Sequence, residues 1–247
     1  MPFPRGAHPE GRPHQVRPAS SIRRNLTDGA TVLGAHNMLN TLYPQLHKRG
    51  AGKGHYVDRL NLFFGRRVEP GLRNWMALVR RRRRILAGGV VPREPEPTLN
   101  PEAFAIARAC AARGWAPVAV ERDVGSVRLR CRTKIDLVVR SAEGHTKVLE
   151  VKCANRSVFT EGTGASCKVG DAHVVATPLV RAHLQAAIGA LLHESTHKSP
   201  VEGTAVLLVH RPTPADAPVC EVFLPPPWMQ HARKALEEAM EKRNARI

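Results

Sequence analysis

Two short, largely apolar segments joined by a glycine-containing turn constrain this chain more than any other feature. They span residues 133–140 and 146–153, with Ser-Ala-Glu-Gly-His between them. Because side chains alternate faces along a strand, this pattern predicts a hairpin whose second strand carries Glu150 and Lys152 on one face. Asp136 lies in the first strand between two apolar residues that must be buried. Burying two acids and a lysine in an apolar hairpin costs free energy, which indicates a functional purpose.

A divalent metal ion would supply the positive charge that these acids need. Mg²⁺ takes oxygen ligands, usually one or two carboxylates together with waters and substrate phosphate. Asp136 and Glu150 fit this description, and the carbonyl of Val151 could add a backbone ligand. Lys152 could hold or help to deprotonate an attacking water, or neutralise the charge that develops in a transition state. The predicted chemistry is metal-assisted phosphodiester hydrolysis, which requires no serine or cysteine nucleophile.

The order Asp136…Glu150-Val151-Lys152 in consecutive strands resembles the PD-(D/E)xK nuclease superfamily. The proline that often precedes the first acid is absent, and Ile135 stands in its place. The resemblance implies an α/β fold with a restriction-endonuclease-like αβββαβ core, a mixed central sheet flanked by helices, and a Mg²⁺ or Mn²⁺ cofactor. The alternative is a solvated strand face with an ion pair, because acid-x-Lys triplets are common.

The surrounding sequence predicts elements in the order that this core requires. Asn100-Pro101-Glu102 has the cap, proline and acid of a helix start, and Gly114 is placed to end that helix. Thr177-Pro178 opens a second helix in the same way. The remaining expected elements are strands at 117–121, 204–210 and 218–224, and a final helix at 228–244. Residues 127–131 are expected to be either a half-exposed strand or the start of the strand that carries Asp136.

Two further polar residues narrow the resemblance to the RecB-like exonuclease branch, which includes nucleases of CRISPR systems, lambda-type exonucleases and the mitochondrial genome maintenance exonuclease. Glu121 precedes Asp136 by one strand, and Gln185 lies in the helix after Lys152. The branch has a tyrosine four residues after the glutamine, where this chain has Gly189. The resemblance implies Glu121 as a third metal ligand and Gln185 as a contact to the metal-water shell or substrate.

Both of these residues also have a structural alternative. Glu121 could be a rim carboxylate paired with Arg122 or Lys134, and Gln185 could hydrogen-bond the long loop before its helix.

Positive charge is concentrated in the N-terminal part of the chain. Residues 1–93 contain 18 Lys+Arg and 4 Asp+Glu, a net charge of +14, whereas residues 94–247 contain 20 and 17, a net charge of +3. Such asymmetry favours a polyanionic partner, with DNA as the first candidate and RNA as another. Five consecutive arginines are predicted to contact it: Arg80, Arg81, Arg82, Arg83 and Arg84. The alternatives are a solvated basic patch or a nuclear-localisation signal.

We expect four regions. Residues 1–24 are expected to be a disordered basic tail, 25–93 a basic helical nucleic-acid-binding region with helices at 28–48, 56–64 and 72–86, 94–99 a linker, and 100–247 the nuclease-like domain. The five cysteines are an odd number without a CxxC pair, which indicates buried thiols in a reducing compartment and predicts no iron–sulfur cluster.

No segment is apolar enough to predict a membrane span. The expected location is intracellular, in the nucleus or the mitochondrion. A virus-encoded protein that acts in the nucleus or the cytoplasm is a further alternative.

The predicted function is a metal-dependent DNA nuclease, with an exonuclease in replication, repair or recombination favoured over an endonuclease. The first alternative is a non-catalytic nucleic-acid-binding protein with a degenerate nuclease fold or an unrelated α/β domain. The second is a scaffold protein whose basic half serves nuclear import.

Overall fold

The computed structural model describes residues 32–47, 55–89, 96–162, 165–213 and 215–245; for 47 and 55–65 only the backbone is described. Its centre is a mixed six-stranded sheet in which β3 pairs with β2, β1 and β4, followed by β7 and β8. The strands are β1 (Leu33–Gly34), β2 (Ala116–Ser126), β3 (Cys131–Arg140), β4 (Thr146–Cys153), β7 (Gly203–His210) and β8 (Val219–Phe223). Pairing is parallel for β1/β3 and β4/β7 and antiparallel elsewhere. The predicted α/β class with a mixed sheet flanked by helices is confirmed.

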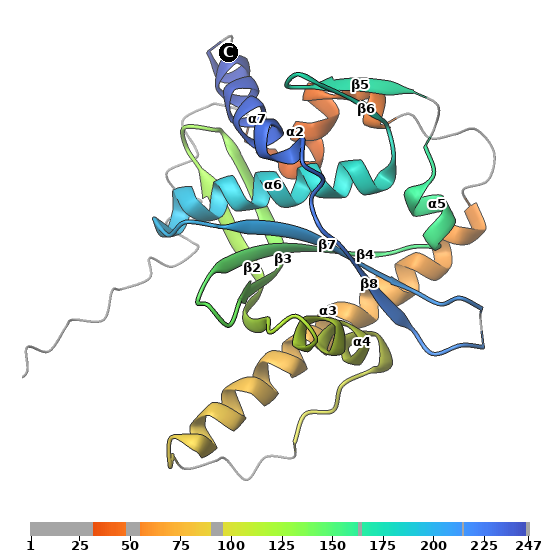
Figure 1. The fold of residues 1–247 in the computed structure, drawn as a ribbon, viewed down its shortest axis with the longest axis vertical. Helices are drawn as coiled ribbons and strands as arrows, with labels where there is room; N and C mark the ends of the chain where they lie inside the picture. The colour runs from red at the N-terminus through yellow and green to blue at the C-terminus, as the bar shows by residue number, and fades with distance from the viewer. Residues whose placement is uncertain (1–31, 48–54, 90–95, 163–164, 214, 246–247) are drawn as a thin grey trace, which may run out of the picture.

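Helices cover both faces of this sheet (Figure 1). The upper layer in that view contains α2 (Ala35–Leu42), α6 (Pro178–His197) and α7 (Met229–Asn244), and the lower layer contains α3 (His55–Leu86) and α4 (Pro101–Ala111). The smaller elements are η1 (Pro44–His47), α5 (Arg156–Thr160) and the separate hairpin β5 (Ser166–Val169) and β6 (Ala172–Val175).

Each helical layer has its own apolar core against the sheet. Leu184 and Ile188 of α6 pack with Val138 and Val148 on one face. Leu72 of α3 packs with apolar residues of α4, β3, β4 and β7 on the other face. The run of five buried residues 205–209 explains why β7 reads as continuously apolar: it lies between two strands and under both layers.

The two predicted helix starts are confirmed by their capping bonds. The side chain of Asn100 accepts a hydrogen bond from the Ala103 N–H at 2.9 Å, and that of Thr177 accepts one from the Val180 N–H at 2.9 Å. Each cap satisfies one of the backbone donors that a helix start leaves free. Gly114 adopts φ 65°, as a glycine that ends a helix does.

A separate strand at 127–131 is not seen, because β2 extends to Ser126 and residues 127–130 form the turn into β3; only Cys131 belongs to the Asp136 strand, as its first residue. Leu129 is buried in that turn, and its N–H bonds the Ser126 hydroxyl at 3.3 Å. Arg128 instead reaches Glu237 and Glu241 of α7. A buried leucine between arginines therefore imitates the alternation of a half-exposed strand.

The three predicted N-terminal helices also differ from the structure. The segment expected to be helical over 28–48 contains β1, α2 and η1, and the two later helices are one 32-residue helix, α3, that continues through Pro70. Gly71 explains the close crossing of α3 and α4, because a Cβ there would lie 2.5 Å from the Ala103 Cβ. The pair is fixed further by buried Glu102, which lies 3.6 Å from Arg67 and 3.3 Å from Arg211.

Parts of the basic N-terminal half are thereby built into the same fold as the rest. Strand β1 pairs with the start of β3, and Arg181 of α6 donates to Asn40 of α2 at 2.6 Å. Residues 66–79 of α3 supply Val68, Leu72 and Trp75 to the lower core. The predicted tail at 1–24 lies outside the described residues, as do residues 94 and 95 of the predicted linker.

Candidate active site

Asp136 lies where the ladder between β3 and β4 ends. The last residue pair of the ladder at this end is Leu137 with Leu149. Asp136 precedes Leu137 in β3 and therefore lies opposite Glu150, which follows Leu149 in β4. There its Oδ2 accepts a hydrogen bond from the Val151 N–H at 2.8 Å. A carboxylate thus occupies the place of a strand partner, and this bond fixes Asp136 against the backbone of the acid-x-Lys segment.

Glu150 and Lys152 lie together as the strand period predicts. The Lys152 Nζ is 2.5 Å from the Glu150 Oε1, and the two side chains are 33% and 14% exposed, respectively. Their backbone is fixed by parallel pairing with β7, where Glu150 lies beside Val206 and Lys152 beside Leu208. Because β4 lies between β3 and β7, its backbone holds both charged groups in fixed positions beside the apolar part of the sheet.

The charges at this site are not balanced. Burial, reinforced by the neighbouring Glu150, raises the pKa of Asp136 from 3.8 to about 7, although Lys152 and the Val151 N–H act in the opposite sense. Burial opposes the charged form of Lys152, but Glu150 and Asp136 outweigh it and raise its pKa. Lys152 is therefore an ammonium at neutral pH, which suits it to hold a water or neutralise charge rather than to accept a proton.

Glu121 completes a row of three acids across three strands. It lies between the pairs Val120–Leu137 and Arg122–Ile135, hence opposite Asp136, and has a left-handed φ of 49°. Its carboxylate pairs with Arg73 of α3 and lies 3.7 Å from Lys134. Burial opposes ionisation of Glu121, but these cations and its hydrogen bonds lower its pKa.

Of the two ion-pair partners proposed for Glu121 from sequence, only Lys134 is seen. Arg122 lies instead 3.3 Å from the His197 Nδ1. Arg73 is a partner that sequence reasoning missed. Within the described ranges, no group of three or more His, Cys, Asp or Glu is arranged to hold a metal ion.

Two cavities reach this row from opposite layers. A cavity of about 210 Å³ on the α3 side is lined by Asp136, Val151, Lys152, Cys153 and Glu121 of the strands and by Val68, Glu69 and Leu72 of the helix. A cavity of about 40 Å³ on the α6 side is lined by Glu150 and Gln185, among others. The structure therefore brings Asp136, Glu121 and Lys152 to one space and places Gln185 beside Glu150 in the other.

Gly189 shows why this chain departs from the RecB-like pattern after Gln185. It lies one turn further along α6, directly against the sheet. A Cβ at this position would lie 3.4 Å from the side chains of both Ile135 and Val148. A tyrosine here has no room, so the close packing of α6 on β3 and β4 requires a small residue.

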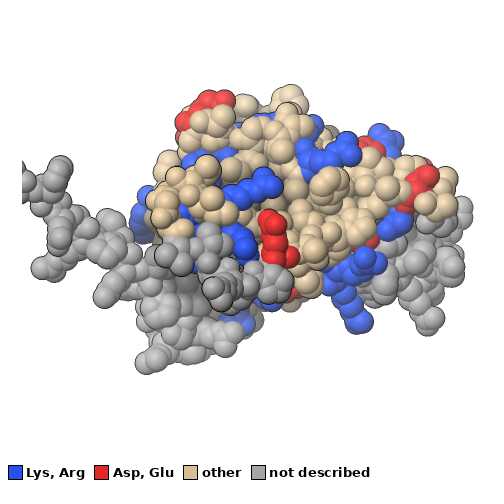
Figure 2. Space-filling model, turned by 90° about the horizontal axis from the view of Figure 1, so that it is seen from below, with Lys and Arg blue, Asp and Glu red and all other residues tan. Residues whose placement is uncertain are grey.

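The predicted arginine run is exposed but lies away from the acids. Arg80, Arg82, Arg83 and Arg84 are exposed, and Arg81 is half-buried, at the end of α3 that extends beyond the core (Figure 1). At 1.5 Å per residue, they lie about 12–18 Å along the helix from Leu72, which lines the larger cavity. We call residues 80–86 the basic arm. Figure 2, which views this lower layer, shows more surface from Lys and Arg than from Asp and Glu.

Arg181 ties α6 to α2 and η1 through Asn40 and the Leu46 carbonyl, the latter at 3.3 Å. His183, considered as a substrate contact, is instead only 3% exposed, and burial lowers its pKa to about 4. All five cysteines are free thiols. The predicted burial is confirmed for Cys110 and Cys131 and also seen for Cys167, whereas Cys153 and Cys220 are only half-buried.

No protein-family model matches this chain, and no curated protein shows significant similarity to it. Among the described helices, none combines the length and the apolar character needed to cross a membrane. The function is therefore argued from the geometry and charge of the site alone.

Proposed function

We propose that the chain is a metal-dependent nuclease that hydrolyses phosphodiester bonds in DNA, with a PD-(D/E)xK site on a restriction-endonuclease-like core. The observation that supports this most is the contact of Asp136 with the Val151 N–H, between Glu150 and Lys152. This contact joins Asp136 to the segment of Val151 and Lys152 at the larger cavity, while Glu150 of the same segment lines the smaller one. We further propose exonuclease action in replication, repair or recombination.

The residues present fit a hard divalent cation such as Mg²⁺ or Mn²⁺. Asp136 is partly buried with a carboxylate opposite it, and burial together with the neighbouring Glu150 raises its pKa to about 7. Mg²⁺ needs only one or two protein carboxylates besides waters and substrate phosphate, so a third protein ligand is not required. Asp136 and Glu150 would hold the ion, with the Val151 carbonyl and Glu121 as further candidates. When bound, the ion would neutralise negative charge on the phosphodiester and polarise it.

The side chains of the chain then have separate roles. Lys152, which is charged and partly exposed, positions the attacking water and stabilises the negative charge of the transition state. The Val151 N–H holds Asp136 in orientation. Gln185 contacts the substrate or the water shell on the Glu150 side. The basic arm attracts the phosphate backbone, which fits a polyanionic DNA or RNA substrate.

The test is cleavage of end-labelled single-stranded and duplex DNA, linear and circular, with Mg²⁺ or EDTA. Lys152→Ala is compared with wild type and with Lys168→Ala, which removes an exposed lysine from the separate β5–β6 hairpin. We expect metal-dependent cleavage that only Lys152→Ala abolishes, with circles spared by an exonuclease. Full cleavage by Lys152→Ala in a clean preparation would contradict the assignment.

A non-catalytic nucleic-acid-binding protein is the second candidate, and one observation favours it. Glu150 is already paired with Lys152 and Glu121 with Arg73, so two of the three acids have cationic partners without a metal. This candidate predicts that Asp136→Asn has no effect on function, whereas neutralising the basic arm abolishes it. The two variants, assayed side by side for binding and cleavage, separate the candidates.

A further inference from the structure

Two cations lie over Trp115 at the turn end of the β3–β4 hairpin, and Arg140 lies at the same end of the sheet. The Arg113 guanidinium carbon lies 5.8 Å, and the Lys147 Nζ 6.0 Å, from the centre of a Trp115 ring. Arg140 pairs with Ala116, the next residue after Trp115, and β4 places Lys147 beside Val139. Cations over an aromatic face are held in place by the ring, so this arrangement is preorganised.

Among the described residues, Arg113, Arg140 and Lys147 do not belong to the group of cations that pair with a carboxylate. Arg73, Arg128, Arg156, Arg211 and Arg233 each form an ion pair with a glutamate. Within the part of the chain that the structure describes, no carboxylate lies within 4.0 Å of Arg113, Arg140 or Lys147. Glu143 in the adjoining turn acts on Lys147 only through space.

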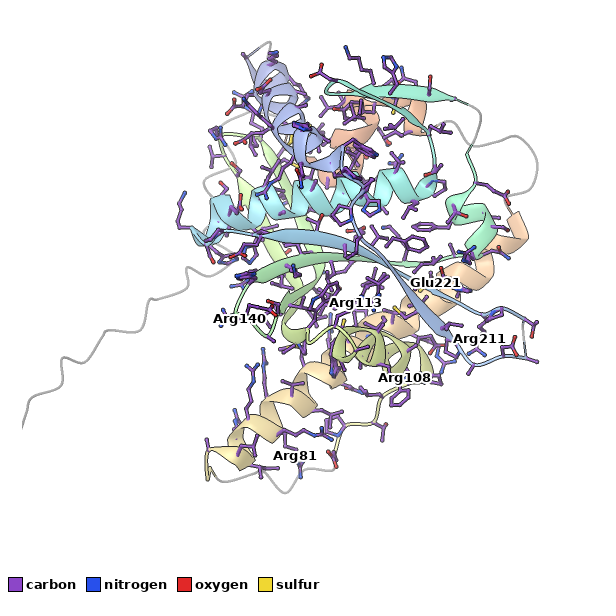
Figure 3. The ribbon with its side chains drawn as sticks, in the orientation of Figure 1. Arg81, Arg108, Arg113, Arg140, Arg211 and Glu221 are labelled. Carbon is purple, nitrogen blue, oxygen red and sulfur yellow. The ribbon has the colours of Figure 1, made fainter. Side chains whose placement is uncertain are left out.

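The backbone also accommodates this arrangement. Lys147 lies across Gly203 of β7, where a Cβ would come within 3.2 Å of its Nζ. Arg113 and Arg140 are exposed, whereas Trp115 is only 8% exposed. In Figure 3, Arg113 and Arg140 lie at the end of the sheet toward the basic arm, where Arg81 is labelled, and Arg108 lies on α4. The surface is therefore open to a large partner.

We propose that Arg113, Arg140 and Lys147 form a binding surface for the phosphate backbone of a nucleic acid, distinct from both the acid row and the basic arm. Arginine presents a planar set of donors that matches phosphate, and lysine adds a compact charge. A phosphate would supply the negative charge that the described neighbours do not. We call these three residues the Trp115 cluster.

Strand geometry sets the distance between this cluster and the acids. Arg140 follows Asp136 by four residues on β3, which corresponds to about 13 Å at roughly 3.3 Å per residue. Duplex DNA rises about 3.4 Å per base pair, so the contacted phosphate would be about four nucleotides from the reacting one. This spacing, though not the binding itself, rests on the proposed nuclease function.

The experiment measures the affinity of a labelled DNA duplex as a function of salt, in EDTA so that no cleavage occurs. The triple variant Arg113→Gln, Arg140→Gln, Lys147→Gln is compared with Lys168→Gln, Lys234→Gln, Lys242→Gln, which removes the same charge from exposed lysines elsewhere. We expect the cluster variant to bind about tenfold more weakly or worse and to lose about two to three from the salt slope, since each phosphate contact contributes about 0.9. Equal effects in both variants would overturn the proposal.

Two single variants keep the test independent of folding defects. Glu143→Gln removes a negative charge that acts on Lys147 and should strengthen binding, a gain that damage to the fold cannot produce. Trp115→Phe should abolish any tryptophan fluorescence change that DNA causes at this surface. Weaker binding by Glu143→Gln, or an unaltered fluorescence change in Trp115→Phe, would contradict a cluster that contacts DNA.

The outcome is separable from that of the nuclease assay. If Lys152→Ala still cleaves, the catalytic assignment fails while binding by the Trp115 cluster stands. If Lys152→Ala loses cleavage but the cluster variant binds DNA as tightly as its control variant, the binding surface fails while the acid row stands.

Discussion

The two ends of the β3–β4 hairpin carry charges of opposite sign: acids gather at the open end and cations at the turn end. At the open end, Asp136 and Glu150 are largely buried and share one lysine. At the turn end, Arg140 and Lys147 are joined by Arg113, with no carboxylate among their described neighbours within ion-pair distance. The same two strands hold both groups apart, so neither end can neutralise the other. The proposed metal ion at the open end and the proposed nucleic acid at the turn end would each bring charge of the opposite sign.

The largest expected effect tests whether the two ends do different work. Asp136→Asn should lower the cleavage rate at saturating DNA by about 10²–10³-fold, as removal of a charge-stabilising group does, and leave DNA binding largely intact. Arg140→Gln should weaken binding and leave the saturated rate within about twofold. Single-turnover cleavage and anisotropy on both variants check this. If both variants change the same parameter, the two ends are one site.

The basic arm sharpens the comparison through salt dependence. Replacing Arg80, Arg82, Arg83 and Arg84 with glutamine should reduce the salt slope of DNA binding by about two to four. If arm and Trp115 cluster contact different phosphates of one duplex, the losses in slope should add when the variants are combined. A combined loss no greater than that of the arm alone would mean that the two surfaces do not bind one duplex together.

A stability effect of a few kcal/mol is expected from Asp136 itself. Its folded pKa of about 7 exceeds the ordinary 3.8, so between these values the folded chain holds a proton that the unfolded chain has lost, and stability falls as pH rises. Asp136→Asn should therefore raise the melting temperature at pH 8 and change it little at pH 4, in the absence of metal. The control Asp171→Asn removes an exposed acid near α7. A stabilisation independent of pH would contradict the buried charge.

The smallest effect concerns the packing beneath the acids. Gly189→Ala gains about 1 kcal/mol of helix propensity, offset by contacts at 3.4 Å to Ile135 and Val148, so the unfolding free energy should change by less than about 1 kcal/mol. Gly189→Tyr should destabilise by several kcal/mol through overpacking. Denaturant unfolding of both variants measures this. A tolerated tyrosine would show that α6 can move away from the acid end.

Local patterns in the sequence predicted the features that depend on local geometry. The strand period of two places Glu150 and Lys152 together, and the cap-plus-proline pairs mark the starts of α4 and α6. The same signals predicted the order of α4, β2, β3, β4, α6 and β7, but not α5 or the hairpin of β5 and β6 between β4 and α6. The predicted hairpin was enough to place Asp136 close to the segment of Glu150 and Lys152, where it contacts the Val151 N–H.

Contacts between distant segments left no comparable signal. Arg73 reaches Glu121 across 48 positions, and it is one of 38 Lys and Arg residues in the chain. The Trp115 cluster draws on α4's end and two strands, so its members are separated by intervening elements. Leu129 resembles a strand residue in the sequence because a single buried leucine in a tight turn gives the same apolar–polar alternation as a half-exposed strand. The continuity of α3 through Pro70 depends on Gly71 fitting against Ala103, which is distant in the sequence.

The pairing of β1 with β3 has a consequence for the order of synthesis. Leu33 leaves the ribosome about 100 residues before Cys131, its partner in the sheet, which is a delay of about 5–20 s at usual elongation rates. Met38 and Leu39, which end fully buried, have no sheet to pack against during that time. The basic N-terminal half therefore cannot complete its fold while it is being made, and a late, long-range docking step should limit how quickly the chain matures.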